Sequence, residues 1–362
     1  MNRSVNRLNA YPVIQAVIAA ALFGASVPVA KVFLAEIEPV TLAGFLYLGS
    51  GIGLSLYKAG QRIRHDSRGR EARLDRKDIP WLVISILAGG VAGPIVLMFS
   101  LRGTPAATAS LLLNFEIVAT TLIASFVFRE AIGRRVWLAI ACIVVASILL
   151  SWREGGDWGF SLSAIGVLGA CALWGVDNNV TRIISAKDPI SIVATKGISA
   201  GGISLALTLI MRSPLPDFKV VLGAMLLGFF SYGLSLVFFI RAMRNLGTAR
   251  ASAFFGTAPF IGGALSFLLF RETPAFLFYV ALPVMVIGAA LILREKHVHE
   301  HYHMAIEHEH GHSHDDEHHT HKHAEETLPS NLYHSHRHRH EDTKHLHPHK
   351  PDIHHRHRHE SL

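Results

Sequence analysis

Cysteine and histidine are nearly absent from most of this 362-residue chain. The two cysteines, Cys142 and Cys171, both lie in apolar segments, which excludes a disulfide framework. His65 is the only histidine before residue 297. The same part of the chain has no phosphate-binding glycine loop and no histidine placed to pair with a serine or a carboxylate. We therefore expect neither enzymatic activity nor a required cofactor.

Charged residues are also scarce between residues 11 and 293, where short basic loops separate one apolar run from the next. These runs are about 20 residues long, the length that crosses the hydrocarbon core of a bilayer. Inside lipid, a helix satisfies every backbone amide. The pattern predicts an all-α polytopic membrane protein with ten transmembrane helices. We place these helices near residues 11–30, 39–57, 80–101, 105–128, 134–152, 161–185, 189–211, 219–242, 249–270 and 274–293.

Basic residues are distributed unequally between alternate loops. If both termini share one side, that side collects 20 Lys and Arg residues outside the tail, against 6 on the other side, leaving out the mid-span Lys196. Basic loops remain in the cytoplasm. The asymmetry therefore predicts a multi-pass protein of the inner (plasma) membrane with both termini cytoplasmic. It also argues against nucleic acid as a partner, although the formal net charge is +7.

Short sequences recur in the two halves of the apolar region. Ala21-Leu22-Phe23-Gly24 is similar to Ala172-Leu173-Trp174-Gly175, and a basic residue, Lys31 or Arg182, follows each glycine by seven positions. We expect a first five-helix repeat over residues 11–152, a second over 161–294, and a tail over 295–362. Because five is odd, the second repeat must be inverted, and inverted repeats with a site between them are typical of carriers.

Six segments carry a resemblance to a known family: Ala21–Ser26, Val29–Lys31, Arg76–Trp81, Ala106–Glu130, Ala258-Pro259 and Arg271-Glu272. In these segments the chain resembles the EamA-type members of the drug/metabolite transporter superfamily. In the fourth span, Glu116-Ile117 stands where the family usually has Glu-Pro. The resemblance covers about residues 12–294. It implies ten helices in two five-helix repeats and a carrier of amino acids, metabolites, drugs or related small solutes.

Several polar side chains fall at membrane depth, where a charge is costly and usually faces a cavity or a partner. The expected substrate-binding residues are Asn114 and Glu116 in the fourth span, Trp174, Asp177 and Asn178 in the sixth, and Lys196 in the seventh. The alternative is that an internal carboxylate pairs with Lys196 and holds the bundle together. Lys31 and Arg182 are expected to extend to a membrane interface.

The tail contains 23 of the 24 histidines within the last 66 residues. Neutral imidazole suits nickel, cobalt and zinc, so we expect the tail to bind a divalent transition metal. The candidate ligands are His308, His310, His312, His314, His318, His319, His321 and His323. Because the tail has few apolar residues, it is expected to be disordered without metal. The alternatives are that the tail only keeps the protein soluble, or that its histidines sense pH.

Together these features predict a secondary carrier that moves a small polar metabolite, amino-acid-like or drug-like, by alternating access, with a metal-binding regulatory tail. The expected partners are a small-molecule substrate, the lipid bilayer and transition metal ions. One alternative is a nickel, cobalt or zinc exporter whose tail collects the ion; the spans argue against it because they contain no histidine. Another is a membrane sensor that transports nothing. The sequence gives neither the cargo nor the oligomeric state.

Overall fold

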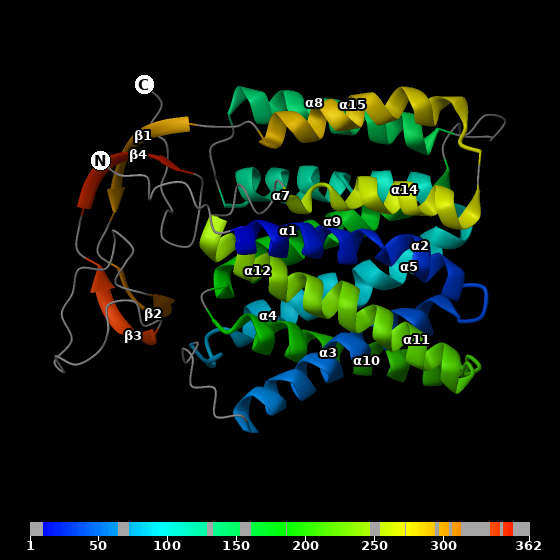
Figure 1. Ribbon diagram of the computed structural model, residues 1–362, viewed down its shortest axis with the longest axis horizontal. Helices are drawn as coiled ribbons and strands as arrows, with labels where there is room; N and C mark the ends of the chain where they lie inside the picture. Colours follow the sequence, from blue (N-terminus) through cyan, green and yellow to red (C-terminus); the bar gives the residue numbers. More distant parts are fainter. Residues whose placement is uncertain are drawn as a thin grey trace.

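The helical body is a bundle, and short strands of the tail lie at one end of it (Figure 1). The computed structural model describes residues 10–63, 72–128, 133–152, 161–185, 187–246, 254–271 and 273–293 of the body, and 297–303, 306–312, 334–340 and 343–349 of the tail. All statements below about the structure concern these residues.

The first part of the body consists of helices joined by short connections. They are α1 (Ala10–Gly24), α2 (Ser26–Phe33), α3 (Pro39–Ile63), α4 (Ile79–Ser85), the π-helical segment η1 (Ile86–Ala92), α5 (Gly93–Gly103), α6 (Ala106–Leu112), α7 (Phe115–Phe126) and α8 (Arg134–Ser151). The second part contains α9 (Leu162–Ile184), α10 (Pro189–Ile210), α11 (Phe218–Gly228), the π-helical segment η2 (Phe229–Leu234), α12 (Ser235–Leu246), α14 (Ala258–Phe270) and α15 (Phe276–Leu293).

Seven of the described helices are long and apolar enough to cross a membrane, and two shorter apolar helices, Ala258–Phe270 and Phe276–Leu291, accompany them. The helix α9, 23 residues long, carries the charged Asp177. Large apolar side chains remain exposed on many of these helices, Leu226 and Ile287 among them. An apolar exterior is what a bilayer requires, so the prediction of a multi-pass helical membrane protein is confirmed.

Interruptions occur at similar places in the two parts of the body. The segment η1 joins α4 to α5, and η2 joins α11 to α12, so each run passes from α-helix through π-helix and back. A turn at Leu113-Asn114 separates α6 from α7, and a turn at Gly256-Thr257 precedes α14. The first of these turns forms although the residue after Glu116 is Ile117 and not proline.

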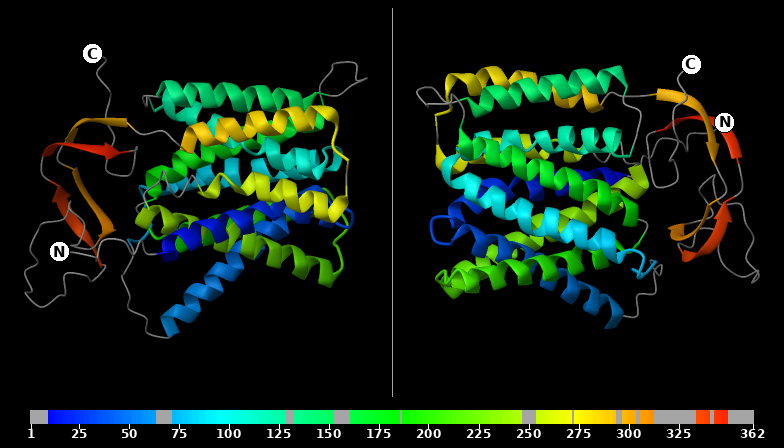
Figure 2. Two further views of the ribbon diagram at one scale, coloured as in Figure 1. Left: turned by 45° about the horizontal axis from the view of Figure 1, so that its top comes forward. Right: turned by 180° about the vertical axis from the view of Figure 1, so that it is seen from behind.

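The helices α3 and α10 cross at glycines. A Cβ atom on Gly197 would lie 2.6 Å from the backbone nitrogen of Gly51, and one on Gly201 would lie 2.6 Å from that of Leu48. Small residues of this kind let helix backbones approach closely in membranes. Elsewhere, α8 packs against α15, so helices from the two parts of the chain lie side by side (Figure 2).

The described residues of the tail form four strands. Strand β1 (His297–His303) pairs with β4 (Thr343–His349), and β2 (Ile306–His312) pairs with β3 (His334–His340), both antiparallel. The expectation of disorder rested on the lack of apolar residues for a core. Antiparallel pairing does not need such a core to satisfy the backbone, because each strand supplies donors and acceptors to the other.

Candidate functional site

Asp177 of α9 and Lys196 of α10 form an ion pair inside the bundle, between Lys196 Nζ and Asp177 Oδ2. The two residues are only 6% and 8% exposed. Removing two charges from water is costly, and the cost is offset only when the charges are paired and hydrogen-bonded. The structure therefore brings together two of the residues that the sequence identifies at membrane depth.

Two hydroxyl groups complete the surroundings of the Asp177 carboxylate. Ser85 Oγ, at the end of α4, donates a hydrogen bond of 2.5 Å to Asp177 Oδ1, and Thr181 Oγ1 donates one of 3.0 Å to the same oxygen. The two hydroxyl oxygens lie 3.1 Å apart. Helices α4, α9 and α10 thus share one polar cluster, in which both carboxylate oxygens have partners. Neither Ser85 nor Thr181 was predicted, because serine and threonine are common in apolar spans and mark no particular site.

The π segment η1 passes directly beside this pair. A Cβ atom on Gly89 would lie 2.0 Å from Asp177 Oδ2, so only glycine leaves room for the carboxylate there. The Gly89 carbonyl oxygen accepts hydrogen bonds from the Tyr47 hydroxyl at 2.7 Å and from Trp174 Nε1 at 3.0 Å. A π segment inside a helix often marks a functional site, and here it joins α3 and α9 through two aromatic donors.

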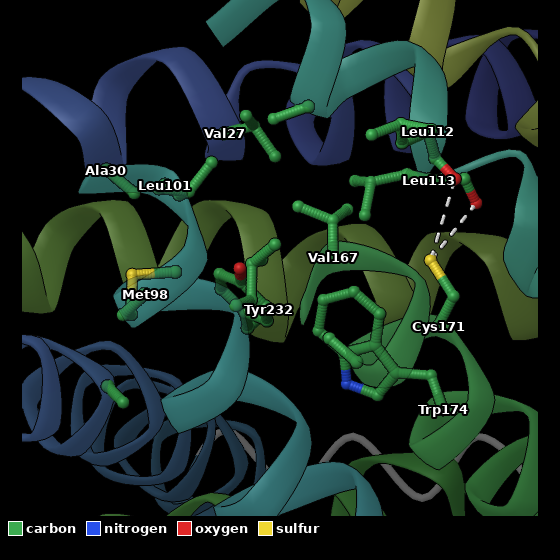
Figure 3. Close-up of a cluster of buried hydrophobic side chains, with 14 of the residues drawn as sticks. Val27, Ala30, Met98, Leu101, Leu112, Leu113, Val167, Cys171, Trp174 and Tyr232 are labelled. Atoms are coloured by element: carbon green, nitrogen blue, oxygen red, sulfur yellow. Dashed lines mark hydrogen bonds between the residues drawn. The ribbon is translucent and has the colours of Figure 1, made fainter. Parts of the chain in front are cut away.

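Aromatic rings from separate helices gather beside the ion pair. The ring centroids of Tyr47 and Tyr232 are 5.4 Å apart, and Phe23 lies 6.0 Å from Tyr232 and 6.5 Å from Trp174. Figure 3 shows Trp174 and Tyr232 among apolar side chains of the core, with the Cys171 thiol directed at the end of α6. Phe255 continues the cluster at 5.2 Å from Phe23. Trp174, which was predicted as a candidate, therefore packs in the core and also donates to η1.

Glu116 and Asn178 meet on the other side of α9. Asn178 Nδ2 donates to Glu116 Oε1 at 2.7 Å and to Thr120 Oγ1 at 3.2 Å, and the Asn178 side chain is exposed. The neighbouring Asn179 is buried and donates to the Thr120 carbonyl oxygen at 3.0 Å. Successive residues of α9 thus connect to different helices: Asp177 to α10, and Asn178 to α7.

Asn114 is fully buried at the turn between α6 and α7. Its Nδ2 donates to the Leu111 carbonyl oxygen at 3.1 Å, while its Oδ1 has no hydrogen-bond partner among the described residues. A buried acceptor without a partner is costly. Of the predicted residues, Asp177 and Lys196 form one group and Glu116 and Asn178 a second. The Asn114 side chain forms no hydrogen bond with either group among the described residues.

No group of three or more His, Cys, Asp or Glu side chains is placed to hold a metal ion in the part of the chain whose side chains are described. Of the histidines predicted as ligands, His308, His310 and His312 lie on strand β2. His314, His318, His319, His321 and His323 lie outside the described residues. Cys142 and Cys171 are free thiols.

Ion pairs also join helix ends at opposite ends of the bundle. At one end, Lys58 of α3 pairs with Asp188, which precedes α10, and Asp188 Oδ1 accepts from the Ile190 amide at 3.0 Å. At the other end, Arg102 pairs with Glu38 at 3.0 Å. Lys31, expected at an interface, donates to the Thr104 carbonyl oxygen at 2.5 Å.

The pKa of Asp188 lies below the ordinary value of an aspartate. Partial burial raises the pKa, but the hydrogen bonds from Lys58 and Ser191, the charge of Lys58 and the Ile190 amide lower it by more. The folded protein therefore favours the ionised carboxylate, which caps α10 and holds it to α3.

Comparison with known proteins places these features in a family context. The sequence profile of the EamA-like transporter family matches residues 10–152 and again residues 161–294. An uncharacterized transporter of Methanothermobacter thermautotrophicus is 26% identical over 276 residues, which cover 72% of this chain and 79% of that protein. A probable 4-amino-4-deoxy-L-arabinose-phosphoundecaprenol flippase subunit ArnE of Yersinia pseudotuberculosis is 30% identical over 83 residues, or 23% of this chain and 72% of that protein.

A solved crystal structure has the same fold, with a TM-score of 0.55 and 19% identity over 77% of this chain and 95% of the other.

Proposed function

The chain belongs to the EamA-like transporter family, and on that premise we propose that it is a secondary carrier of a small polar metabolite, amino-acid-like or drug-like. The observation that carries this proposal is the buried Asp177–Lys196 pair, at membrane depth and beside a π segment. Ionisable residues inside membrane helices commonly mark the path of a substrate or an ion. We assign these residues a role in transport and not in catalysis.

The carrier works by alternating access between two inverted five-helix repeats, over residues 11–152 and 161–294. The two separate matches of one family profile support this division. So do η1 and η2, which interrupt two helical runs at similar places in the two parts of the chain. Inverted repeats allow a body to exchange two conformations that open to opposite sides around a site at the midplane.

The substrate competes with the internal ion pair. A zwitterionic solute carries one group of each sign, so its ammonium group replaces Lys196 beside Asp177 while its carboxylate group binds Lys196. The residues that we assign to the substrate site are Asn114, Glu116, Trp174, Asp177, Asn178 and Lys196. Asn178 offers an exposed amide, and Asn114 offers a buried carbonyl oxygen that has no partner among the described residues.

The histidine-rich tail binds divalent nickel, cobalt or zinc in the cytoplasm and regulates the carrier. The 20-to-6 distribution of basic residues between alternate loops supports cytoplasmic termini in the inner membrane. Neutral imidazoles are suitable ligands for these ions. A second candidate function is a nickel, cobalt or zinc exporter whose tail collects the ion. The 23 tail histidines favour this function. The described part of the helical body argues against it, because it contains no group of three side chains that could hold a metal ion.

Flux of zwitterionic solutes into proteoliposomes tests the proposed carrier. Asp177→Asn and Lys196→Gln each leave one buried charge unpaired, which costs about 3–5 kcal/mol and endangers folding. The double variant Asp177→Asn/Lys196→Gln removes both charges and is expected to fold, because neutral replacement of a buried pair is often tolerated. We expect the double variant to have background flux and Lys58→Gln, at the end of the bundle, to retain flux. Wild-type flux in the double variant would reject the proposed site.

Two deletions distinguish a carrier from an exporter. If the protein is the proposed carrier, solute flux persists after removal of residues 297–362 and no longer responds to metal. If it is an exporter, cells that lack the whole gene accumulate nickel, cobalt or zinc and grow poorly in the presence of that metal. Unchanged metal content and tolerance after deletion of the whole gene would reject the exporter.

A further inference from the structure

The π-helical segment η2 lies against the first part of the chain, as η1 lies against the second. Ser231 Oγ of η2 donates a hydrogen bond of 2.7 Å to the Leu22 carbonyl oxygen of α1. A Cβ atom on Gly233 of η2 would lie 3.2 Å from Ser50 Oγ of α3. The contacts of η2 with α1 and α3 therefore correspond to the contacts of η1 with α9 and α10, the two helices that hold the ion pair.

Ser26 has the place in the first part of the chain that Asp177 has in the second. The segment Phe23–Ser26 corresponds in sequence to Trp174–Asp177, with an aromatic residue and a glycine ahead of the polar residue. Ser26 is only 1% exposed, and its hydroxyl group has no hydrogen-bond partner among the described residues. The same position is thus charged and fully paired in α9, but neutral and unpaired at the start of α2.

Ser50 is a second buried hydroxyl of this kind, on α3. It is also 1% exposed, and its Oγ has no partner among the residues whose side chains are described. It follows Tyr47 by three residues, which places the two side chains on one face of the helix. Ser110 and Ser266, in contrast, each donate to the carbonyl oxygen four residues earlier, at 2.8 and 2.7 Å. Ser26 and Ser50 therefore retain a hydrogen-bonding capacity that these other buried serines have used.

Aromatic rings connect the two serines with the ion pair. Phe23 and Tyr47, each three residues before one of the serines, both contact Tyr232 of η2, with ring centroids 6.0 and 5.4 Å apart. Phe23 also lies 6.5 Å from Trp174, which precedes the buried carboxylate of α9 by three residues. One continuous group of rings thus extends from the charged residues to the neutral ones, and Trp174 and Tyr232 are drawn within it in Figure 3.

We propose that Ser26 and Ser50 form a neutral subsite of the carrier, which binds an uncharged hydroxyl group of the solute. A buried hydroxyl without a partner is costly, and a serine hydroxyl can both donate and accept. A solute hydroxyl supplies the missing donor and acceptor, while Asp177 and Lys196 bind the ammonium and carboxylate groups of the same solute. The rings between the two poles contact its apolar carbon atoms, so the substrate class is a hydroxylated amino acid or a close analogue.

This subsite rests on the proposed function and adds a preference among zwitterionic solutes. A site that hydrogen-bonds a hydroxyl group rejects the analogue without it, because the polar groups of the site then remain unpaired. An apolar pocket lacks this discrimination and accepts both. Threonine and valine have nearly the same shape and differ by a hydroxyl group, and so do tyrosine and phenylalanine. These two pairs of solutes therefore isolate the contribution of the subsite.

Competition for flux into proteoliposomes, within each pair of amino acids, tests the subsite. We compare Ser26→Ala/Ser50→Ala with Ser147→Ala/Ser151→Ala, which removes two equally buried hydroxyls of α8 that also lack partners among the described residues. The wild type and the control should prefer the hydroxylated member of at least one pair by about tenfold or more. The subsite variant should carry the two members of that pair about equally.

Thermal unfolding provides a second measurement that does not depend on flux. Neither double variant should lower the unfolding midpoint, because each removes only hydroxyls that have no partner. A bound solute raises the midpoint, so the preferred hydroxylated amino acid should raise it more in the wild type and the control than in the subsite variant.

Three results are decisive against the subsite. It is overturned if the subsite variant keeps the wild-type preference, or if both double variants lose that preference equally. A wild type that carries both members of each pair equally well would reject the subsite and leave the proposed carrier intact. A wild type that shows neither flux nor a thermal shift with any of the four amino acids would reject the proposed zwitterion site itself, and the subsite with it.

Discussion

Gly89 determines how closely the π segment η1 can approach the Asp177 carboxylate. A Cβ atom at this position would lie 2.0 Å from Asp177 Oδ2, so Gly89→Ala must displace the carboxylate or η1. Overpacking of this kind typically costs about 1–3 kcal/mol. We expect Gly89→Ala to lower the thermal unfolding midpoint of the purified protein and to reduce solute flux.

Gly169→Ala on α9 is the matched control for this substitution. The nearest heavy atom to a Cβ atom at Gly169 is 4.0 Å away, an ordinary van der Waals distance. The control should keep the wild-type midpoint or exceed it slightly, because alanine favours helix over glycine. If Gly89→Ala and Gly169→Ala behave alike, the close contact between η1 and Asp177 does not constrain the site.

Asp188 makes stability depend on pH. Its pKa is lowered in the folded protein, so its stabilising effect is present above the ordinary aspartate pKa of about 4 and is lost as pH falls through the lower folded value. Asp188→Asn retains a side chain suited to a helix N-cap and removes the charge that pairs with Lys58.

At neutral pH, Asp188→Asn should be less stable than the wild type by about 1 kcal/mol, the order expected for a partly exposed pair. The difference should begin to shrink below about pH 4, where Asp188 of the unfolded protein takes up a proton. It should vanish once the pH falls through the lower pKa of Asp188 in the folded protein. Thermal unfolding in detergent across this pH range measures the effect. A difference that persists unchanged at low pH would show that the charge of Asp188 is not its cause.

The residues at membrane depth could be identified from the sequence because a charge there is rare and costly. The pairing of Lys196 with a carboxylate was one of two interpretations, and the structure selects Asp177 as the partner. The contributions of Ser85, Gly89 and Tyr47 could not be predicted. Each depends on which helices meet, and nothing in the local sequence of a span specifies its neighbours.

At the scale of elements, the crossing of α3 and α10 depends on small residues. A Cβ atom on Gly197 would lie 2.6 Å from Gly51 N and 2.8 Å from the Tyr47 carbonyl oxygen, both in the backbone of α3. Gly197→Ala should force the helices apart, destabilise the protein by about 1–3 kcal/mol and disturb Lys196, its neighbour on α10.

Gly202→Ala on the same helix has no heavy atom within 4 Å of its Cβ position. It should therefore leave the unfolding midpoint and the flux unchanged. The two variants differ only in which face of α10 carries the added methyl group. Equal destabilisation of both would assign the effect to the loss of glycine itself rather than to the crossing with α3.

The positions of the helices follow closely from the apolar runs, because length and hydrophobicity determine which segments span lipid. The interruption of the first span at Ala25 and the π segments η1 and η2 do not follow, since tertiary packing selects them. The tail strands do not follow from the apolar runs for a different reason. Their evidence lies in complementary spacing between two distant segments, Glu-x-Glu in β2 and Arg-x-Arg in β3, and not in the apolar content of either.

At the scale of the whole molecule, ion pairs occur both at the ends of helices and inside the bundle. Lys58–Asp188 joins helix ends on one side and Arg102–Glu38 on the other, while Asp177–Lys196 lies inside the bundle between them. A carrier that alternates its access must open each end in turn while the central site stays within reach of water. The exposed Asn178, next to Asp177 on α9, is the residue best placed to report such access.

The most direct test of this account is the reaction of a cysteine at Asn178 with a membrane-impermeant thiol reagent, in a protein whose Cys142 and Cys171 are replaced by alanine. The control is Leu226→Cys, on an exposed apolar position of α11. We predict that Asn178→Cys is modified from the aqueous phase, that a transported solute slows its modification, and that Leu226→Cys is unreactive. An Asn178→Cys that reacts no faster than Leu226→Cys from either side of the membrane would contradict a water-accessible site between the two halves.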